Sequence, residues 1–184
     1  NRVSVVGVIS NPRSYRNRRG LTALREIVAR DPQAVHVALE HRDTLGETLA
    51  DFARRGVGLV VVNGGDGTVQ AVITALLNGH QFAQTPDLAL LPAGRTNLIA
   101  HDIGLAGRPL DGLARLLSGA LLTGADQAVL TLHPGGGAAP LHGMFFGTAA
   151  FYRATMLARA KYHPLGAAGG VVVGFSLVSA VARA

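Results

Sequence analysis

The sequence predicts an α/β fold in which a parallel sheet is covered by helices on both faces. Two observations support this prediction. Apolar runs of strand length alternate four times with segments whose apolar residues recur at helical spacing. The clearest run, residues 59–62, is unbroken and rich in valine, which is typical of a parallel strand buried on both faces. A chain of 184 residues, 48% of them hydrophobic, is also long enough to bury such a core.

The first two strand–helix pairs occupy residues 3–54. A strand is expected over residues 3–9, and it ends at Asn11-Pro12. The loop that follows is basic and contains Arg13, Arg16, Arg18 and Arg19. A helix over residues 21–29 has apolar residues on one face. A second strand (35–39) and a second helix (44–54) come next, with Asp43 or Thr44 as the expected N-cap.

The third pair is centred on a glycine-rich turn that follows the strand of residues 59–62. The turn consists of Gly64, Gly65, Asp66, Gly67 and Thr68. Glycines let a ligand approach the main chain closely, and the amides of such a turn and of the following helix favour a polyphosphate. Asp66 suits a magnesium ion or a hydroxyl group. Thr68 is expected to cap the helix, which ends near residues 78–79.

An ordinary strand-to-helix turn explains the same residues without any ligand. In that interpretation Asp66 accepts hydrogen bonds from backbone amides and has no chemical role. The turn alone therefore leaves both interpretations open.

The fourth pair consists of a strand over residues 88–91, broken by Pro92, and a helix over residues 109–120. The loop between them contains Gly94, Arg95, Thr96 and Asn97. The carboxyl ends of parallel strands lie at the same edge of a sheet. We therefore expect the loops at Asn11, Gly64 and Gly94 to converge on one cleft.

The pattern changes after residue 124, where we expect a domain boundary. Residues 1–124 are interpreted as a nucleotide-binding α/β domain, and residues 125–184 as a partial, β-rich second domain. In the latter, a hairpin is expected from strands at 128–132 and 141–146, followed by a helix at 150–159. The apolar run of residues 165–182 is expected to pack as a buried helix, with membrane-surface contact and a membrane span as alternatives.

Composition restricts the classes of partner. The net charge is +6 and comes from arginine, since Lys161 is the only lysine, so phosphate groups or anionic lipid are suitable partners. Aromatic residues make up only 5% of the chain, which argues against nucleic acid as a partner. Because there is no cysteine, disulfides, zinc–thiolate sites and cysteine nucleophiles are excluded, and a cytoplasmic location fits.

Three loops together resemble the diacylglycerol kinase catalytic family, which includes bacterial lipid kinases, sphingosine kinases and ceramide kinases. Asn11-Pro12-Arg13-Ser14 resembles the Asn-Pro-x-Ser segment of that family. Residues 64–68 match its Gly-Gly-Asp-Gly-Thr signature, and residues 91–97 resemble its Leu-Pro-x-Gly-Thr-x-Asn loop. The resemblance covers most of residues 1–124.

The resemblance implies a fold and an activity. The fold is a Rossmann-like domain of the NAD kinase and diacylglycerol kinase type, followed by the start of a β-sandwich domain that helps to hold the lipid. The activity is ATP- and Mg²⁺-dependent transfer of the terminal phosphate to a hydroxyl of diacylglycerol or a related lipid. We expect peripheral contact with the inner face of the membrane, while the sequence leaves homo-oligomerisation open.

Site residues follow from the same resemblance. Asp66 is expected to be catalytic and to serve the metal ion. The nucleotide-binding residues are expected to be Asn11, Arg13, Gly64, Gly65, Gly67, Thr68, Gly94, Arg95, Thr96 and Asn97.

The chain departs from the family pattern in places. Arg95 occupies a position that is usually threonine, and Leu98 replaces an aspartate common in diacylglycerol-type members. Residues 147–152 match the family weakly. No acidic residue follows Asp126, so the late carboxylate that takes the proton from the lipid hydroxyl is missing. We expect the chain to be a fragment of a longer protein, with catalytic alteration as the alternative.

Two other functions remain open. An NAD kinase-like enzyme shares the turn of residues 64–68 and a similar α/β domain. A non-catalytic nucleotide- or lipid-binding protein is compatible with the missing late carboxylate.

Overall fold

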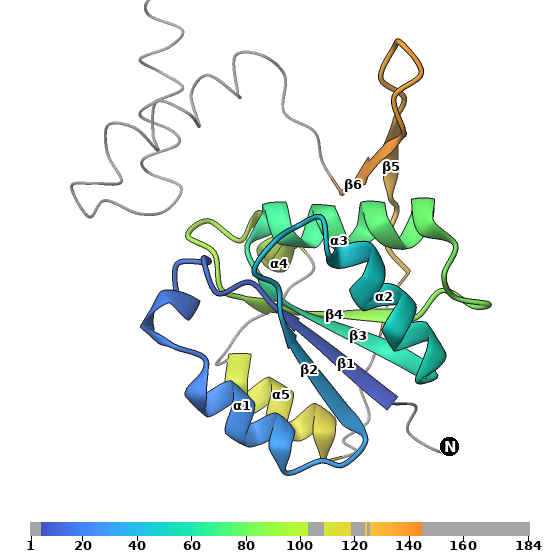
Figure 1. Ribbon diagram of the computed structural model, residues 1–184. Coiled ribbons are helices and arrows are strands. Elements are labelled where there is room, and N and C mark those ends of the chain that lie inside the picture. Colours follow the sequence, from blue (N-terminus) through green and yellow to red (C-terminus); the bar gives the residue numbers. More distant parts are fainter. Residues whose placement is uncertain (1–4, 103–108, 119–123, 125, 145–184) are drawn as a thin grey trace, which may run out of the picture. The chain divides into compact units, whose positions relative to one another are not determined.

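A four-stranded parallel sheet forms the centre of the unit that ends at Met144 (Figure 1). The computed structural model describes residues 5–102, 109–118, 124 and 126–144. The strands lie in the order β2-β1-β3-β4, and every neighbouring pair is parallel. Their bounds are β1 (Val5–Ser10), β2 (Ala34–Ala38), β3 (Val57–Gly64) and β4 (Asp87–Pro92). The predicted α/β fold is confirmed. Pro92 does not break β4 but is its last residue, paired with Gly64 at the edge of the sheet.

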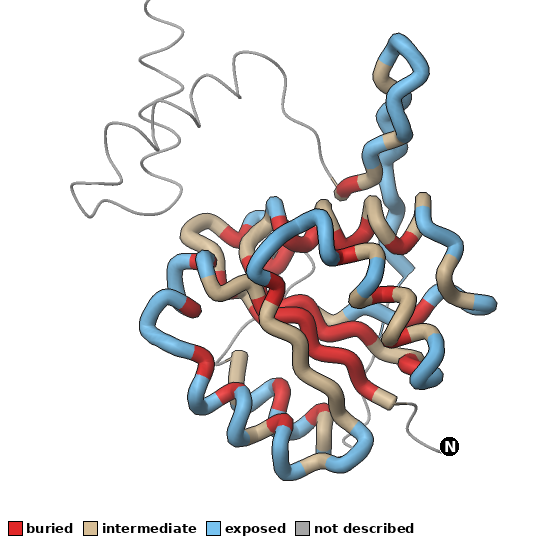
Figure 2. Tube along the Cα trace, in the orientation of Figure 1, coloured by how far each residue is buried: buried red, intermediate tan, exposed pale blue. Residues whose placement is uncertain are grey.

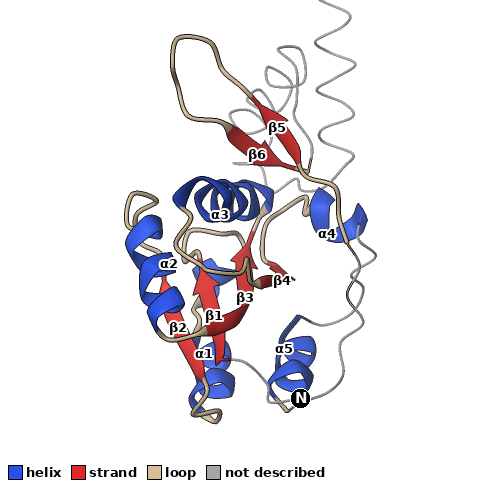
Figure 3. Cartoon of the chain, turned by 90° about the vertical axis from the view of Figure 1, so that its right-hand side faces the viewer, coloured by secondary structure: helices blue, strands red, loops and turns tan. Residues whose placement is uncertain are grey.

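Helices cover both faces of this sheet (Figures 1 and 3). One face carries α1 (Thr22–Ala29) and α5 (Pro109–Leu117), and the other carries α2 (Leu45–Arg54) and α3 (Asp66–Gly79). All four helices predicted for residues 1–124 are present, although α5 ends at Leu117 rather than at residue 120. Two short elements were not predicted: a 3₁₀ helix at Asn17–Arg19 and α4 at Leu98–Asp102. Both are too short to show an apolar periodicity.

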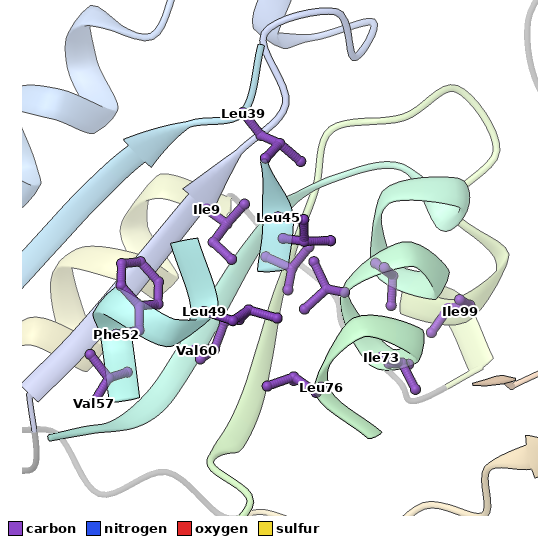
Figure 4. Packing of buried hydrophobic residues seen from close by; sticks show 13 residues of the cluster. Ile9, Leu39, Leu45, Leu49, Phe52, Val57, Val60, Ile73, Leu76 and Ile99 are labelled. Atoms are coloured by element: carbon purple, nitrogen blue, oxygen red, sulfur yellow. The ribbon is translucent and has the colours of Figure 1, made fainter. Parts of the chain in front are cut away.

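The two faces of the sheet bury separate apolar clusters because side chains alternate along each strand. Val6 and Val8 of β1 join the cluster under α1 and α5, whereas Ile9 joins the cluster under α2 and α3. In β3, Val61 faces the first cluster, and its neighbours Val60 and Val62 face the second. Figure 4 shows the second cluster, with Val60 among its labelled residues. The central strands are therefore buried on both faces (Figure 2), as the valine-rich run predicts.

One predicted N-cap is wrong, and the other is confirmed in its position. Helix α3 begins two residues before Thr68, with Gly65 in the N-cap position, because the chain turns into the helix directly after β3. Thr44 does occupy the N-cap position of α2, but its side chain makes no capping bond. Its hydroxyl donates instead to the carbonyl oxygen of His41 (2.9 Å), and the carboxylate of Asp43 accepts from the Thr44 amide.

The predicted hairpin is confirmed, with shorter strands. β5 (Leu130–Leu132) and β6 (Leu141–Gly143) pair antiparallel. The hairpin is fastened to α3 by polar side chains: the Thr74 hydroxyl bonds both the amide and the carbonyl of His142, and the Asn78 side chain donates to the carbonyl of Pro140. The boundary after residue 124 stays a prediction.

Several expectations lie outside the described residues. They are the remainder of the β-sandwich, the helix at 150–159 and the apolar run at 165–182. None of the helices within residues 5–102 and 109–118 combines the length and the apolar character that crossing a bilayer requires.

Packing between Gly7 and Phe52 generates a first prediction. A Cβ added at Gly7, in the middle of β1, would overlap the ring of Phe52, which is fully buried on α2. Gly7→Ala should therefore lower the free energy of unfolding by about 1–3 kcal/mol. In a Phe52→Leu background the same change should cost less, since the shorter side chain leaves room for the methyl group. Urea unfolding of the four proteins measures this coupling, and strictly additive effects would contradict it.

Candidate functional site

The candidate site lies at the carboxyl ends of two neighbouring strands that lead into helices on opposite faces of the sheet. β1 and β3 are adjacent in the sheet, but β1 leads into α1 on one face and β3 leads into α3 on the other. In open α/β sheets, ligands bind at such a switch point, outside the carboxyl ends of the strands. The loops predicted to carry the site begin at these ends.

Backbone hydrogen bonds join the three loops. The amide of Asn11 donates to the carbonyl of Asn63 (2.9 Å), which links the loop after β1 to β3. The amide of Ala93 donates to the carbonyl of Gly64 (2.9 Å), and the amide of Arg16 donates to the carbonyl of Ala93 (3.0 Å). The loops at Asn11, Gly64 and Gly94 therefore meet at one edge of the sheet, as predicted, but they do not all line the pocket described below.

Asn11 connects the first loop to the helix that follows the glycine-rich turn. Its side-chain nitrogen donates to the hydroxyl oxygen of Thr68 (2.9 Å). Its side-chain oxygen accepts from the amide of Arg13 (2.9 Å). Thr68 is buried inside the first turn of α3, so this pair fixes the position of Arg13 relative to the N-terminus of α3.

The glycines at the site are required by close packing. A Cβ at Gly94 would lie 2.7 Å from the Cα of Gly65, and a Cβ at Gly64 would lie 2.6 Å from the Cβ of Thr68. None of these three glycines has a positive φ. Any larger residue at Gly94 would separate the two loops.

Asp66 holds the two loops together by a different contact. One carboxylate oxygen accepts from the amide of Leu98 (3.1 Å) and the other from the amide of Ile99 (3.0 Å), which caps the N-terminus of α4. These bonds to backbone amides are of the kind that the ordinary-turn interpretation predicts. Each oxygen retains an acceptor site, so a metal ion beside Asp66 is compatible with the capping role.

Within the described residues, no group of three or more His, Asp or Glu side chains is placed to hold a metal ion. In enzymes that transfer phosphate groups, Mg²⁺ is usually held by one or two carboxylates together with phosphate oxygens and water, and the carboxylate of Asp66 fits that arrangement.

The loop after β4 is held in shape by Asn97. This residue has a left-handed backbone (φ 51°), and its side chain both accepts from the amide of Gly94 (2.8 Å) and donates to its carbonyl (3.0 Å). Arg95 lies between Gly94 and Asn97 in the sequence, and its guanidinium lies over the ring of Tyr15, 4.5 Å from the ring centre. The cation–π contact ties Arg95 to the loop after β1.

A pocket of about 490 Å³ opens between β1, β2 and α3. Three predicted site residues line it: Asn11, Arg13 and Thr68. The loop after β2, which the sequence analysis did not assign to the site, supplies most of the wall. Its lining residues are Leu39, Glu40, His41, Arg42 and Asp43, and Ala71 of α3 completes the pocket. The signal was available, since β2 is also a parallel strand whose carboxyl end lies at the same edge.

The residues of the loop after β4 do not line this pocket. Gly94 packs against Gly65 of the glycine-rich turn, and Gly64, Gly65, Asp66 and Gly67 do not line the pocket either.

Buried polar side chains link the strand ends to the loop after β1 by hydrogen bonds. The fully buried Ser10 hydroxyl accepts from the side chain of Asn63 (3.1 Å) and is hydrogen-bonded to the ring of His36 (2.9 Å). Asn17 donates to the carbonyls of Asn11 (2.8 Å) and Asn63 (3.2 Å). Burial, and secondarily the positive charge of Arg25, lowers the pKa of His36.

A family model described as the diacylglycerol kinase catalytic domain matches residues 5–127, more than half of the chain. Among curated proteins, a probable lipid kinase YegS-like protein of Stenotrophomonas maltophilia (strain K279a) is 36% identical over 67 residues, which are 36% of this chain and 22% of that protein. The chain thus spans well under half the length of this relative.

Solved structures show the same fold. Two chains of putative diacylglycerol kinases from Bacillus anthracis str. Sterne each match with a TM-score of 0.53 and 21% identity. Each alignment covers 71% of this chain, and 44% and 42% of those chains, respectively. At this identity the likeness establishes the fold alone.

The buried His36 generates a prediction about pH. Because its pKa is lowered in the folded state, the unfolded state binds more protons below the ordinary histidine pKa of about 6.5. The stability that neutral His36 provides is therefore complete above that pH and is lost as the pH falls toward the lowered value. Between pH 7 and 5, the free energy of unfolding should therefore fall less steeply in His36→Gln than in wild type. The difference in slope should correspond to at most about one proton taken up on unfolding.

Urea unfolding of wild type and His36→Gln at several pH values measures this difference. His133→Gln, at an exposed position in the β5–β6 loop, is the matched control for removing one histidine. Parallel curves for wild type and His36→Gln would contradict the prediction.

Proposed function

The chain belongs to the diacylglycerol kinase catalytic domain family, and from this premise we propose that it takes part in ATP-dependent phosphorylation of a lipid hydroxyl, with diacylglycerol or a related lipid as acceptor. The observation that carries the proposal is the convergence of three loops, each joined to the next by backbone hydrogen bonds, beside a pocket of about 490 Å³. A pocket of this size is in the range of small-molecule sites.

Nucleotide binding is proposed for the pocket and the glycine-rich turn. The first amides of α3 and the backbone of Gly64, Gly65 and Gly67 provide donors for phosphate oxygens. Asn11 and Thr68 line the same pocket and fix each other, and Arg13 adds a positive charge. Phosphoryl transfer depends mainly on alignment and charge neutralisation, and these residues supply both.

Asp66 is proposed to serve the metal ion as well as the backbone. When bound, magnesium would neutralise negative charge on the phosphate oxygens. The chain's own contribution is positional: Asp66 fixes the start of α4 relative to the turn, so the loops after β3 and β4 keep one arrangement.

The loop after β4 is proposed to complete the phosphate site. Gly94 touches Gly65, which precedes α3, and Asn97 holds the backbone at Gly94 in place. Arg95 follows Gly94, and its guanidinium lies over the ring of Tyr15. We propose that it binds a phosphate group together with the backbone of Thr96.

Peripheral contact with a membrane is proposed for the arginine-rich loop after β1. Arg13, Arg16, Arg18 and Arg19 are exposed, as is Tyr15, and no acidic residue precedes Glu26 in the sequence. Anionic lipid surfaces attract such clusters, and tyrosine is suited to the interface. A lipid acceptor has to be reached at this interface.

The activity is tested by transfer of the labelled terminal phosphate of ATP, with magnesium, to mixed acceptors. Diacylglycerol, sphingoid bases, total bacterial lipid and NAD are incubated together and the products are separated. Label in a lipid is the expected result and identifies the acceptor class. Label in NADP would replace the proposal by an NAD kinase-like function, and binding of ATP without any transfer would indicate a binding protein.

Asp66 variants test the site assignment. Asp66→Asn keeps one acceptor for the α4 amides but loses the charge, so transfer should fall at least 100-fold, a loss of the size seen when one electrostatic group at a reacting centre is removed. Thermal unfolding of the same variant separates this effect from loss of the α4 cap, which should cost about 1 kcal/mol. Transfer at the wild-type rate in Asp66→Asn would remove Asp66 from the mechanism.

Membrane contact is tested by flotation with vesicles. Binding to vesicles containing anionic phospholipid should exceed binding to neutral vesicles and should fall as salt is raised. A variant with Arg16→Gln and Arg18→Gln should bind more weakly, since each basic residue near an anionic surface contributes about 1 kcal/mol. Equal binding of wild type and variant would show that this loop is not the contact.

A further inference from the structure

Three polar side chains lie together where one face of the sheet reaches its carboxyl edge. Ser10 of β1, His36 of β2 and Asn63 of β3 are on the face that α1 and α5 cover, because each comes two residues after an apolar residue of the cluster on that face. Ser10 and Asn63 are buried, and His36 is partly buried. None of the three lies in the motif loops. We call them the polar cluster.

The hydroxyl group of Ser10 has one proton and two hydrogen-bond partners. Its oxygen accepts from the side-chain nitrogen of Asn63 (3.1 Å) and lies 2.9 Å from Nε2 of His36. Among the described residues this hydroxyl group has no other partner, so its proton is donated to Nε2. Nε2 can accept only in the neutral imidazole that carries its proton on Nδ1.

A proton on Nε2 of His36 conflicts with this arrangement. The charged ring has only donors, so Ser10 would have to accept from His36 and Asn63 together, and its own proton would be left without an acceptor in a buried place. Burial, and secondarily the positive charge of Arg25 on α1, already lowers the pKa of His36. Of the elements packed against β2, α1 carries one further charged side chain, Glu26, and β1 has no titratable side chain.

Asn63 connects the polar cluster to the candidate site. Its backbone carbonyl accepts from the amide of Asn11 (2.9 Å) and from the side chain of Asn17 (3.2 Å), which fixes the loop after β1. The next residue is Gly64, so the glycine-rich turn starts directly from Asn63. A shift of Asn63 would therefore move both the loop after β1 and the turn that are proposed to bind phosphate.

We propose that Ser10 is a positioning residue for the proposed phosphate site, and that it holds Asn63 in the binding arrangement only while His36 is neutral. This inference rests on the proposed function and adds a dependence on pH to it. Uptake of a proton by His36 breaks the bond between Ser10 and Asn63 and weakens the binding of a nucleotide that carries phosphate. By linkage, nucleotide binding favours the neutral ring of His36.

Binding of ADP to the full chain between pH 8 and 5.5 tests the inference, measured by isothermal titration calorimetry. The affinity of wild type should fall more steeply with falling pH than that of His36→Gln, because the glutamine oxygen accepts from Ser10 and does not titrate. The difference in slope should correspond to at most about one proton per ADP bound. The phosphate groups of ADP also titrate at about pH 6, so only differences between the proteins count.

Ser10→Ala removes the connection between His36 and Asn63. The ADP affinity at pH 8 should fall roughly five-fold, which is the effect of losing about one hydrogen bond. The pH dependence that remains should match that of His36→Gln, because His36 no longer acts on Asn63. A residue that only stabilised the fold would not change the pH dependence in this way.

His133→Gln is the matched control for removing one histidine. His133 is exposed in the β5–β6 loop, so this variant should keep the pH dependence of wild type. Circular dichroism at each pH shows whether the variants are folded. If Ser10→Ala does not fold, the comparison of wild type with His36→Gln decides the question.

The outcomes separate the inference from the proposed function. Wild type that binds ADP with the same pH dependence as His36→Gln would overturn the inference and leave the proposed function standing. Ser10→Ala with the full pH dependence of wild type would also overturn it, because His36 would then act by another route. Wild type that binds no ADP at any pH would overturn the proposed function itself, and the inference with it.

Discussion

The contact between Gly65 and Gly94 is the constraint on which the site depends. Two loops, one after β3 and one after β4, approach so closely that a methyl group at Gly94 would lie 2.7 Å from the Cα of Gly65. The approach allows the amide of Ala93 to reach the carbonyl of Gly64, and it brings the amides of Leu98 and Ile99 to the carboxylate of Asp66. Bonds of this kind form only at short range, so they follow from the absence of side chains at the two glycines.

Buried polar side chains at the carboxyl edge of the sheet form hydrogen bonds with one another and with the backbone of the loops. An unpaired buried polar group costs about 1–3 kcal/mol, so each bond at Ser10, Asn63 and Asn17 penalises movement of the chain segments it joins. The carboxyl edge of the sheet is therefore held by hydrogen bonds, whereas its two faces are held by apolar packing.

Positive charge gathers at this edge of the sheet. The N-terminus of α3, Arg13 and Arg42 bring positive charge to one pocket, and Arg95 adds another cation beside it, held by the ring of Tyr15. Family membership accounts for the loops at Asn11, Gly64 and Gly94. The loop after β2 is a fourth loop at this edge, and it adds both basic and acidic side chains to the lining of the pocket. The nucleotide proposal therefore draws on contacts that the motifs alone do not describe.

The sequence by itself determined the order of strands and helices, the parallel sheet and the convergence of three loops. These follow from local patterns, such as the valine run of β3 and the apolar face of α1, together with the rule that parallel strands end at one edge. Tertiary structure alone decided the beginning of α3 at Asp66, the capping of α4 by Asp66, and the position of Arg42 over Gly67. The last two of these join residues far apart in the chain. Their distance in space depends on how the strands and helices pack, which no local pattern encodes.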